Sequence, residues 1–483
     1  MTLVALPLIP LIAAGLIALS RNRAFIETIH TLATLVTLVV GITIALQVWS
    51  NGALIALGDL LRVDALSALM VIVITLLGAI AALYSLGYMR AEFDDAHFAQ
   101  ARTYFALFHL FIFTMLVAVT TDNLGVMWVA IEGTTLATVF LVNLHNTRTS
   151  LEAAYKYLIV SSVGIALAFL GTVLMYYAGA AQGEVAVNWS TLRAAASSLN
   201  PQVVRLAFVF ILIGYGTKAG LAPMHTWLPD AHSEAPAPIS ALMSGVLLNV
   251  GLYAVMRFKA VTDAAVGVEF ASRLLLGIGL LSLAVAAVFL LTQRNYKRML
   301  AYSSVEHMGI VCLALGFGGY WGIFGALFHL VNHALSKSLL FIVSGNILLK
   351  YHTTEINDVR GLLRSAPLTG GAFLAGILAL IGLPPFAPFI SEFIIFRAGL
   401  ESNPWVAVVG IGLLVVVFAG MLLSLNRMLY GAQPEARSVP RGDALKWSLA
   451  PLAVNLALLL ILGLTLPSGF VNALDQVVKV LGG

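Results

Sequence analysis

Long apolar runs separated by short polar segments follow one another along almost the whole chain of 483 residues. A helix that crosses the hydrocarbon layer of a bilayer, about 30 Å thick, needs about 20 mostly apolar residues. Fourteen runs approach or exceed that length, so the pattern predicts an all-α polytopic membrane protein. The predicted spans cover residues 3–20, 28–49, 65–86, 104–121, 123–144, 155–178, 204–221, 237–258, 271–292, 299–317, 321–349, 368–396, 405–429 and 447–466. The first run has no basic segment before it, and we expect it to remain as a span rather than to act as a signal peptide.

Composition narrows the class of protein further. Hydrophobic residues make up 60% of the chain and charged residues 10%, against about 25% charged residues in a soluble domain. This excludes a soluble enzyme, a nucleic-acid binder and a disordered scaffold. The single cysteine, Cys312, cannot hold a four-thiolate cluster, and no glycine-rich phosphate loop is present. We therefore expect no cofactor and no metal in this chain, and any redox chemistry in a partner subunit.

Lysine and arginine residues are unevenly divided between the two sets of loops. Loops after odd-numbered spans hold Arg21, Arg23, Arg90, Arg102, Arg148, Arg294, Lys297, Arg298, Lys350, Arg360, Arg364, Arg437, Arg441 and Lys446. The opposite loops hold half as many, namely Arg62, Arg193, Arg205, Arg257, Lys259, Arg273 and Arg397. Because cytoplasmic loops are enriched in these residues, we expect a bacterial or archaeal cytoplasmic (inner) membrane location with both termini outside. The tail after Leu466 is too short for a long lateral helix.

A short glycine/proline pattern occurs twice. Gly220-Leu-Ala-Pro223 ends the seventh span, and Gly382-Leu-Pro-Pro385 lies within the twelfth. Proline removes a backbone donor, so both spans should be discontinuous, and interrupted spans at matching places in two halves are typical of transport sites. Spans 4–8 and 9–13 would then be two inverted five-helix repeats. The corresponding division is residues 1–100 for the first three helices, 101–260 and 261–430 for the repeats, and 431–483 for the last helix and tail.

Ionisable side chains occur inside several predicted spans, where each costs at least about 2.5–3.5 kcal/mol and usually marks an ion path. They are Glu132, Lys156, Lys218, His329, His333, Lys337 and Glu392. The three groups of the eleventh span recur every four residues, so they lie on one helix face and extend over about 12 Å. Such a ladder can pass protons on. Glu132 and Lys218 fit a pair in which the carboxylate sets the lysine's proton affinity, by about 2 kcal/mol at about 8 Å and an effective dielectric near 20.

Structural interpretations of the same residues stay open. Glu132 with Lys218 could be a structural ion pair, and Lys156 could extend to the interface. His329 and His333 could be ordinary core histidines. His307 and Glu306, at the start of the tenth span, are ambiguous. His225, Asp230, His232 and Glu234 follow the first glycine/proline pattern and form either a proton mouth or a solvated loop.

Three stretches carry a family resemblance, namely residues 218–232, 297–304 and 329–337. They resemble the antiporter-like proton-translocating subunits of respiratory complex I (chains M and N), group 4 membrane-bound hydrogenases and Mrp-type sodium/proton antiporters. Residues around Glu306 and Glu392 look most like component F of the hydrogenase-4 type. The resemblance implies fourteen helices with two inverted repeats and discontinuous seventh and twelfth helices.

The resemblance also implies roles for individual residues. Glu132 would be the charge-pair glutamate, Lys218 the first proton carrier, Lys337 the central lysine and Glu392 the terminal carrier, with His329 and His333 lining a hydrated path. One residue departs from many relatives of the chain M type, which have a lysine where this chain has Asn249. An asparagine takes up no proton near neutral pH, so the link between Lys218 and Lys337 would rely on water or histidine.

Three functions compete. The first is a proton-pumping module of a membrane oxidoreductase. Moving one charge against 100 mV costs about 2.3 kcal/mol, so this module needs a cluster-bearing redox arm and other membrane subunits as partners. Sister antiporter-like subunits are further candidate partners. The second is a proton/sodium exchanger in an Mrp-like assembly without a redox partner. The third is a membrane anchor that has lost transport. Lipids, and no nucleic acid, are the remaining expected partners.

Overall fold

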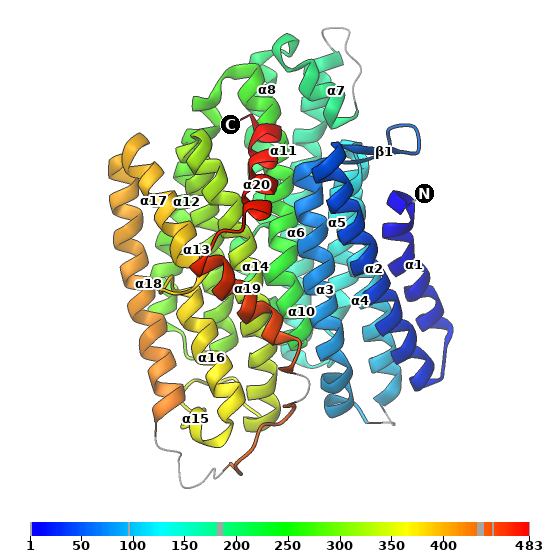
Figure 1. The fold of residues 1–483 in the computed structure, drawn as a ribbon, viewed down its shortest axis with the longest axis vertical. Coiled ribbons are helices and arrows are strands. Elements are labelled where there is room, and N and C mark those ends of the chain that lie inside the picture. Colours follow the sequence, from blue (N-terminus) through cyan, green and yellow to red (C-terminus); the bar gives the residue numbers. More distant parts are fainter. Residues whose placement is uncertain (1, 95–96, 181–186, 432–438, 447–448, 483) are drawn as a thin grey trace.

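The computed structural model describes residues 2–94, 97–180, 187–431, 439–446 and 449–482, and Arg437 lies outside them. These residues are mostly helical (Figure 1). The helices are α1 (Thr2–Leu19), α2 (Arg23–Asn51), α3 (Ala65–Glu92), α4 (Phe98–Thr120), α5 (Leu124–Val142), α6 (Arg148–Ala180), α7 (Trp189–Ala194), α8 (Pro201–Lys218), α9 (Trp227–Glu234), α10 (Ala237–Leu242), α11 (Leu248–Val266), α12 (Val268–Thr292), α13 (Tyr296–Phe317), α14 (Gly319–Tyr351), α15 (Leu362–Ser365), α16 (Pro367–Leu380), α17 (Ala387–Ser402), α18 (Pro404–Tyr430), α19 (Leu452–Leu464) and α20 (Ser468–Leu481).

Eleven of the described helical segments are long and apolar enough to cross a membrane, α10 and α11 counting as one, or up to twelve if α19 and α20 form one bent span. The predicted multi-pass helical architecture is thereby confirmed. The predicted spans at 204–221 and 368–396 are not among these segments. Their helices α8 and α16 end at Lys218 and Leu380, and α16 has only fourteen residues. The total of fourteen stays a prediction.

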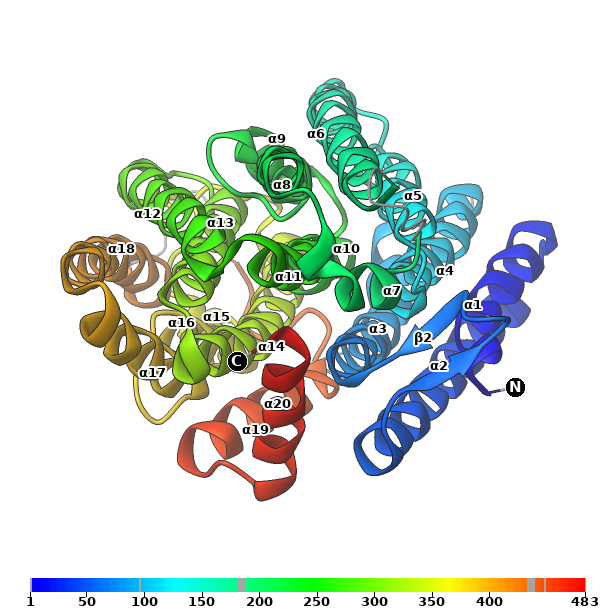
Figure 2. The ribbon, with the colours of Figure 1, turned by 90° about the horizontal axis from the view of Figure 1, so that it is seen from above.

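The most deeply buried helices are not the most apolar ones. In their most apolar stretches α10–α11, α13 and α14 are entirely buried, yet α13 and α14 have a mean hydropathy of only 1.4. The outer helix α18 has a value of 2.9 and is 28% buried. In the view from above, α11 and α14 lie inside the bundle, whereas α1, α2 and α18 lie at its edges (Figure 2). Apolar surface facing outward and polar side chains facing inward are what a lipid surrounding requires.

Both expected helix interruptions are present. After α8 the chain passes through Gly220, with φ +74°, and resumes a regular helix at α9. After α16 it passes through Gly382, with φ +68°, and resumes at α17. A positive φ is readily adopted only by glycine, so each glycine permits the turn that ends its helix.

Several elements had no clear sequence signal. Strands β1 (Leu54–Ala56) and β2 (Leu61–Val63) form a small antiparallel hairpin before α3. A π-helical segment, Met243–Leu247, joins α10 to α11. The tail predicted to lack a long lateral helix forms the fourteen-residue α20, bent by 83° from α19. Of these, the π-helical segment lies nearest the buried polar side chains described next.

Candidate functional site

Lys218 and Glu132 are brought together through a hydroxyl group. Lys218 is the last residue of α8 and is fully buried. Its Nζ donates to Thr135 Oγ1 at 2.5 Å, and the Thr135 hydroxyl donates to Glu132 Oε2 at 3.0 Å. Ser162 of α6 donates to the other carboxylate oxygen, also at 3.0 Å. The ammonium and carboxylate are therefore at most 5.5 Å apart, closer than expected, and share one bridging side chain.

Aromatic rings connect Lys218 to a buried histidine. Its Nζ lies 3.4 Å from the Tyr157 hydroxyl. The Tyr157 ring lies 4.6 Å, between centroids, from Trp227, and Trp227 lies 6.2 Å from His232. His232 is fully buried against Phe341 of α14, with 5.2 Å between the ring centroids. Neither of its ring nitrogens has a hydrogen-bond partner among the described residues. The solvated-loop interpretation is therefore wrong for His232.

The expected ladder of α14 is fully inside the protein. His329, His333 and Lys337 are each at most 1% exposed. Lys337 Nζ donates to the Leu300 carbonyl oxygen at 2.8 Å and to the Ser303 hydroxyl, both on α13. No hydrogen-bond partner for either nitrogen of His333 is found among the described residues. The ladder thus faces α13 rather than lipid.

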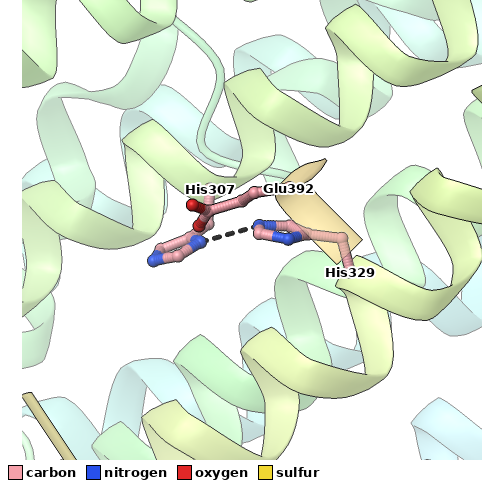
Figure 3. A group of neighbouring side chains, drawn as sticks. All are labelled: His307, His329 and Glu392. Carbon is pink, nitrogen blue, oxygen red and sulfur yellow. Dashed lines mark hydrogen bonds between the residues drawn. The ribbon is translucent and has the colours of Figure 1, made fainter. Parts of the chain in front are cut away.

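His307 of α13 contacts the His329 end of this ladder, which in turn contacts α17. Its Nδ1 lies 2.8 Å from His329 Nε2, and its ring centroid lies 5.3 Å from that of His333. His329 Nδ1 lies 3.0 Å from Ser391 Oγ on α17. His307, His329 and Glu392 each offer an atom within 4.8 Å of the others, as Figure 3 shows. Four of the predicted residues, namely the buried His307, His329 and His333 and the partly exposed Glu392, therefore form one group spanning three helices.

Gly382 leaves room for Glu392. A Cβ atom added to this glycine would lie 2.2 Å from Glu392 Oε2, and the positive φ of Gly382 already disfavours other residues. The second helix interruption is therefore in direct contact with the predicted terminal carrier.

Asn249 lies between the two groups of titratable residues. It follows the π-helical segment, and its amide nitrogen donates to Gly245 O at 2.8 Å and approaches Leu330 O of α14 at 3.4 Å. Two residues further on, a Cβ on Gly251 would lie 2.7 Å from the Ala219 nitrogen, so α11 packs closely against the end of α8. π-Helical turns are frequent at functional sites. Asn249 Oδ1 has no partner within the described part of the chain.

Lys156 and His225 lie apart from these contacts. The Lys156 side chain is 50% exposed and pairs with Glu152 at 2.7 Å and Asp230 at 3.1 Å. Asp230 also pairs with Arg298 at 2.5 Å. His225 is buried in the short 3-10 turn before α9, with its ring centroid 6.1 Å from that of Tyr302.

Sequence reasoning missed the hydroxyl groups that connect the charged ones. Thr135, Tyr157, Ser303 and Ser391 each contact a predicted site residue. Thr135 could have been found, because a residue three positions after Glu132 shares its helix face. Ser303 belongs to another helix than Lys337, and no local periodicity joins the two.

Comparison with known proteins places the chain in a family. Residues 121–419 match the family described as NADH:quinone oxidoreductase/Mrp antiporter, TM. Residues 56–100 match the family described as NADH-Ubiquinone oxidoreductase (complex I), chain 5 N-terminus. The first match alone covers more than half of the chain.

Individual relatives of this chain support the same family assignment. The Hydrogenase-4 component F homolog of Methylacidiphilum infernorum is 40% identical over 393 residues, which are 80% of this chain and 81% of that protein. NADH-quinone oxidoreductase subunit N of Desulforudis audaxviator is 33% identical over 413 residues, 84% of this chain and 80% of that one. A chain in the structure of the membrane-bound sulfane sulfur reductase (MBS), an archaeal respiratory membrane complex, has a TM-score of 0.89 at 25% identity, covering 99% of this chain and 97% of that chain. This protein is therefore a member of the NADH:quinone oxidoreductase/Mrp antiporter family of antiporter-like membrane subunits.

Proposed function

We propose that this chain is the proton-translocating membrane subunit of a multisubunit respiratory oxidoreductase, driven by redox chemistry in partner subunits. The observation that carries the proposal is the series of titratable side chains inside the bundle, which runs from the partly buried Glu132 on α5 through buried lysines and histidines to the partly buried Glu392 on α17, with hydroxyl groups and rings between them. Such groups are costly inside a membrane unless they serve an ion path. Relatives named as hydrogenase-4 and NADH-quinone oxidoreductase components support an oxidoreductase setting.

Water completes the path in this proposal. Buried polar atoms without a partner among the described residues occur on His232, Asn249, Asn332, His333, Ser336 and Ser338. In a hydrocarbon surrounding each such atom costs several kcal/mol unless it is hydrogen-bonded. Water molecules bound to these atoms remove that cost and bridge the distance from His232 to the α14 ladder. Asn249 then takes part as a water ligand and not as a proton carrier.

Each predicted residue has a role in this scheme. Glu132 regulates the charge of Lys218, Lys337 is the central carrier, and Glu392 is the terminal one. His307, His329 and His333 connect Lys337 with Glu392. Lys156 and His225 belong to the uptake side, near the surface ion pairs of Asp230.

The proposed topology has fourteen spans, with α8–α9 and α16–α17 as the two discontinuous ones. The backbone supports two related halves, because the same hydrogen bonds occur 162 residues apart: Gly220 N to Thr217 O and Leu221 N to Gly216 O, then Gly382 N to Ala379 O and Leu383 N to Leu378 O. Residues 101–260 and 261–430 are the inverted repeats, flanked by 1–100 and 431–483. Both chain ends lie in the upper half of Figure 1, which agrees with termini on one side, assigned to the outside.

The experiment uses the complex that purifies with this chain, reconstituted into proteoliposomes. Lys218→Met should lower proton translocation at least about tenfold, a loss of about 1.4 kcal/mol or more in the driving step, while electron transfer between donor and acceptor continues. Lys479→Met, at an exposed lysine of α20, is the matched control. Unchanged translocation in Lys218→Met would overturn the proposal in favour of a membrane anchor. Sodium-dependent proton flux without any electron donor would instead favour the Mrp-like exchanger.

A further inference from the structure

The two histidines and the carboxylate at the α17 end of the buried series have the composition of a divalent metal site. We propose that His307 Nδ1, His329 Nε2 and a Glu392 carboxylate oxygen bind Zn²⁺, with a water molecule as the fourth ligand. The three side chains come from α13, α14 and α17, and Figure 3 shows them directed toward one another. Two imidazoles and one carboxylate with an open fourth position form an established zinc ligand set.

The distances permit this coordination after a small movement. The three candidate ligand atoms already lie within 4.8 Å of one another. The two histidine nitrogens are 2.8 Å apart, at hydrogen-bond distance. In a tetrahedral site with Zn–N bonds of about 2.05 Å, two nitrogens lie about 3.3 Å apart. The rings therefore need to separate by about 0.5 Å, and the Glu392 oxygen, within 4.8 Å of the nitrogens, needs to approach them by up to about 1.5 Å.

Neighbouring groups fix the tautomer of His329 that a metal requires. Ser391 Oγ donates its single hydrogen to Pro388 O at 3.0 Å and accepts from Asn332 Nδ2 at 3.0 Å. With its hydrogen directed to Pro388 O, it accepts from His329 Nδ1, also 3.0 Å away. His329 then carries its hydrogen on Nδ1 and turns the Nε2 lone pair toward the cluster. Outer hydrogen bonds of this kind are typical of metal-binding histidines. When the metal binds, the hydrogen of His307 moves from Nδ1 to Nε2.

Access and charge also suit a cation. The two histidines are at most 1% exposed, whereas Glu392 is partly exposed and provides a way in from the surface of this chain. Glu306, the residue before His307 on α13, is also buried and adds a second carboxyl group to this part of the bundle.

Zinc bound at this site would have a consequence for proton transfer, and this consequence rests on the proposed function. A Glu392 carboxylate bonded to Zn²⁺ can neither take up nor release a proton. The bound metal would therefore block the terminal step of proton transfer, and chelation would restore it.

The test measures zinc binding itself, without turnover, on the purified complex that contains the full chain. We expect one Zn²⁺ per chain to be lost in His329→Asn and in Glu392→Gln. X-ray absorption at the zinc edge should show two imidazoles at about 2.0–2.1 Å. Ser391→Ala keeps all three ligands and should weaken binding about 10- to 100-fold. His352→Asn is the control, because His352 is exposed and its left-handed backbone suits asparagine.

Each outcome has a distinct meaning. The same zinc stoichiometry in wild type and in His329→Asn would overturn the site, as would a spectrum with fewer than two imidazoles. If His329→Asn fails to assemble, unchanged zinc affinity in Ser391→Ala overturns it, and a weakened affinity supports it. Zinc bound as expected but without effect on proton translocation would leave the metal site standing and count against Glu392 as the terminal carrier.

Discussion

Replacing Glu132 by Gln tests whether this carboxylate controls the charge of Lys218. Glutamine keeps the shape of the side chain and an oxygen that can accept from Thr135, so the change removes charge and little else. Thr135 holds the ammonium and the carboxylate within 5.5 Å of each other. The perturbation is therefore mainly electrostatic, and Coulomb's law gives its size.

At 5.5 Å and an effective dielectric of about 20, the attraction between the two charges is about 3 kcal/mol. This energy favours the protonated form of Lys218. Without it, the proton-binding constant of the lysine falls by about a hundredfold, since about 1.4 kcal/mol corresponds to a factor of ten. Lys218 would then need a proton concentration about a hundred times higher to be loaded equally well.

The assay is the pH profile of redox-driven proton translocation in proteoliposomes. In Glu132→Gln we expect the profile to move by about two pH units toward acid, as the hundredfold change requires. Translocation would be low at neutral pH and partly restored at lower pH. Glu269→Gln is the matched control, because Glu269 is exposed and pairs with Arg273 on the surface. A Glu132→Gln profile that coincides with the wild-type profile would refute the electrostatic coupling, whatever the rate at neutral pH.

Three further substitutions test other parts of the structure. Lys337→Met should abolish proton translocation while the complex still assembles on a native gel, because the change removes a buried charge and not a packing contact; translocation above a tenth of the wild-type rate would contradict this. Gly382→Ala introduces a Cβ 2.2 Å from a carboxylate oxygen at a positive φ, so it should reduce translocation strongly, whereas Gly412→Ala, with open space around it, should leave the rate unchanged. Asp64→Asn breaks the buried pair with Arg257, whose two contacts are 2.6 Å each, and should destabilise the protein by about 3–5 kcal/mol. A thermal unfolding temperature equal to that of wild type would show that this pair contributes nothing.

Local sequence features predicted much of the helical architecture. Apolar length alone located the eleven long helices, because a membrane-crossing helix has a minimum length that no soluble helix needs. The glycine/proline patterns located both interruptions, because backbone geometry there depends on single residues. The strands β1 and β2 have three residues each, too few for an alternating pattern, and the bend before α20 left no periodic signal.

The site was predictable where its residues share a helix. His329, His333 and Lys337 were grouped by their spacing of four, and the structure has them on one buried face. The position of His307 between His329 and His333 depends on how α13 packs against α14, which the spacing along one chain segment does not report. The contact between Ser391 and His329 likewise depends on how α17 packs against α14.

The packing around His232 bears on the departure from the family pattern at Asn249. Asn249 stands where many chain M relatives have a lysine, so no amino group is available on α11 at that point to carry a proton between the halves. His232 is fully buried and contacts α14 through Phe341, four residues after Lys337. In the proposed path, water bound to the two ring nitrogens of His232, which have no hydrogen-bond partner among the described residues, connects Lys218 with Lys337. The loss of a lysine at position 249 therefore does not by itself imply a loss of proton transfer.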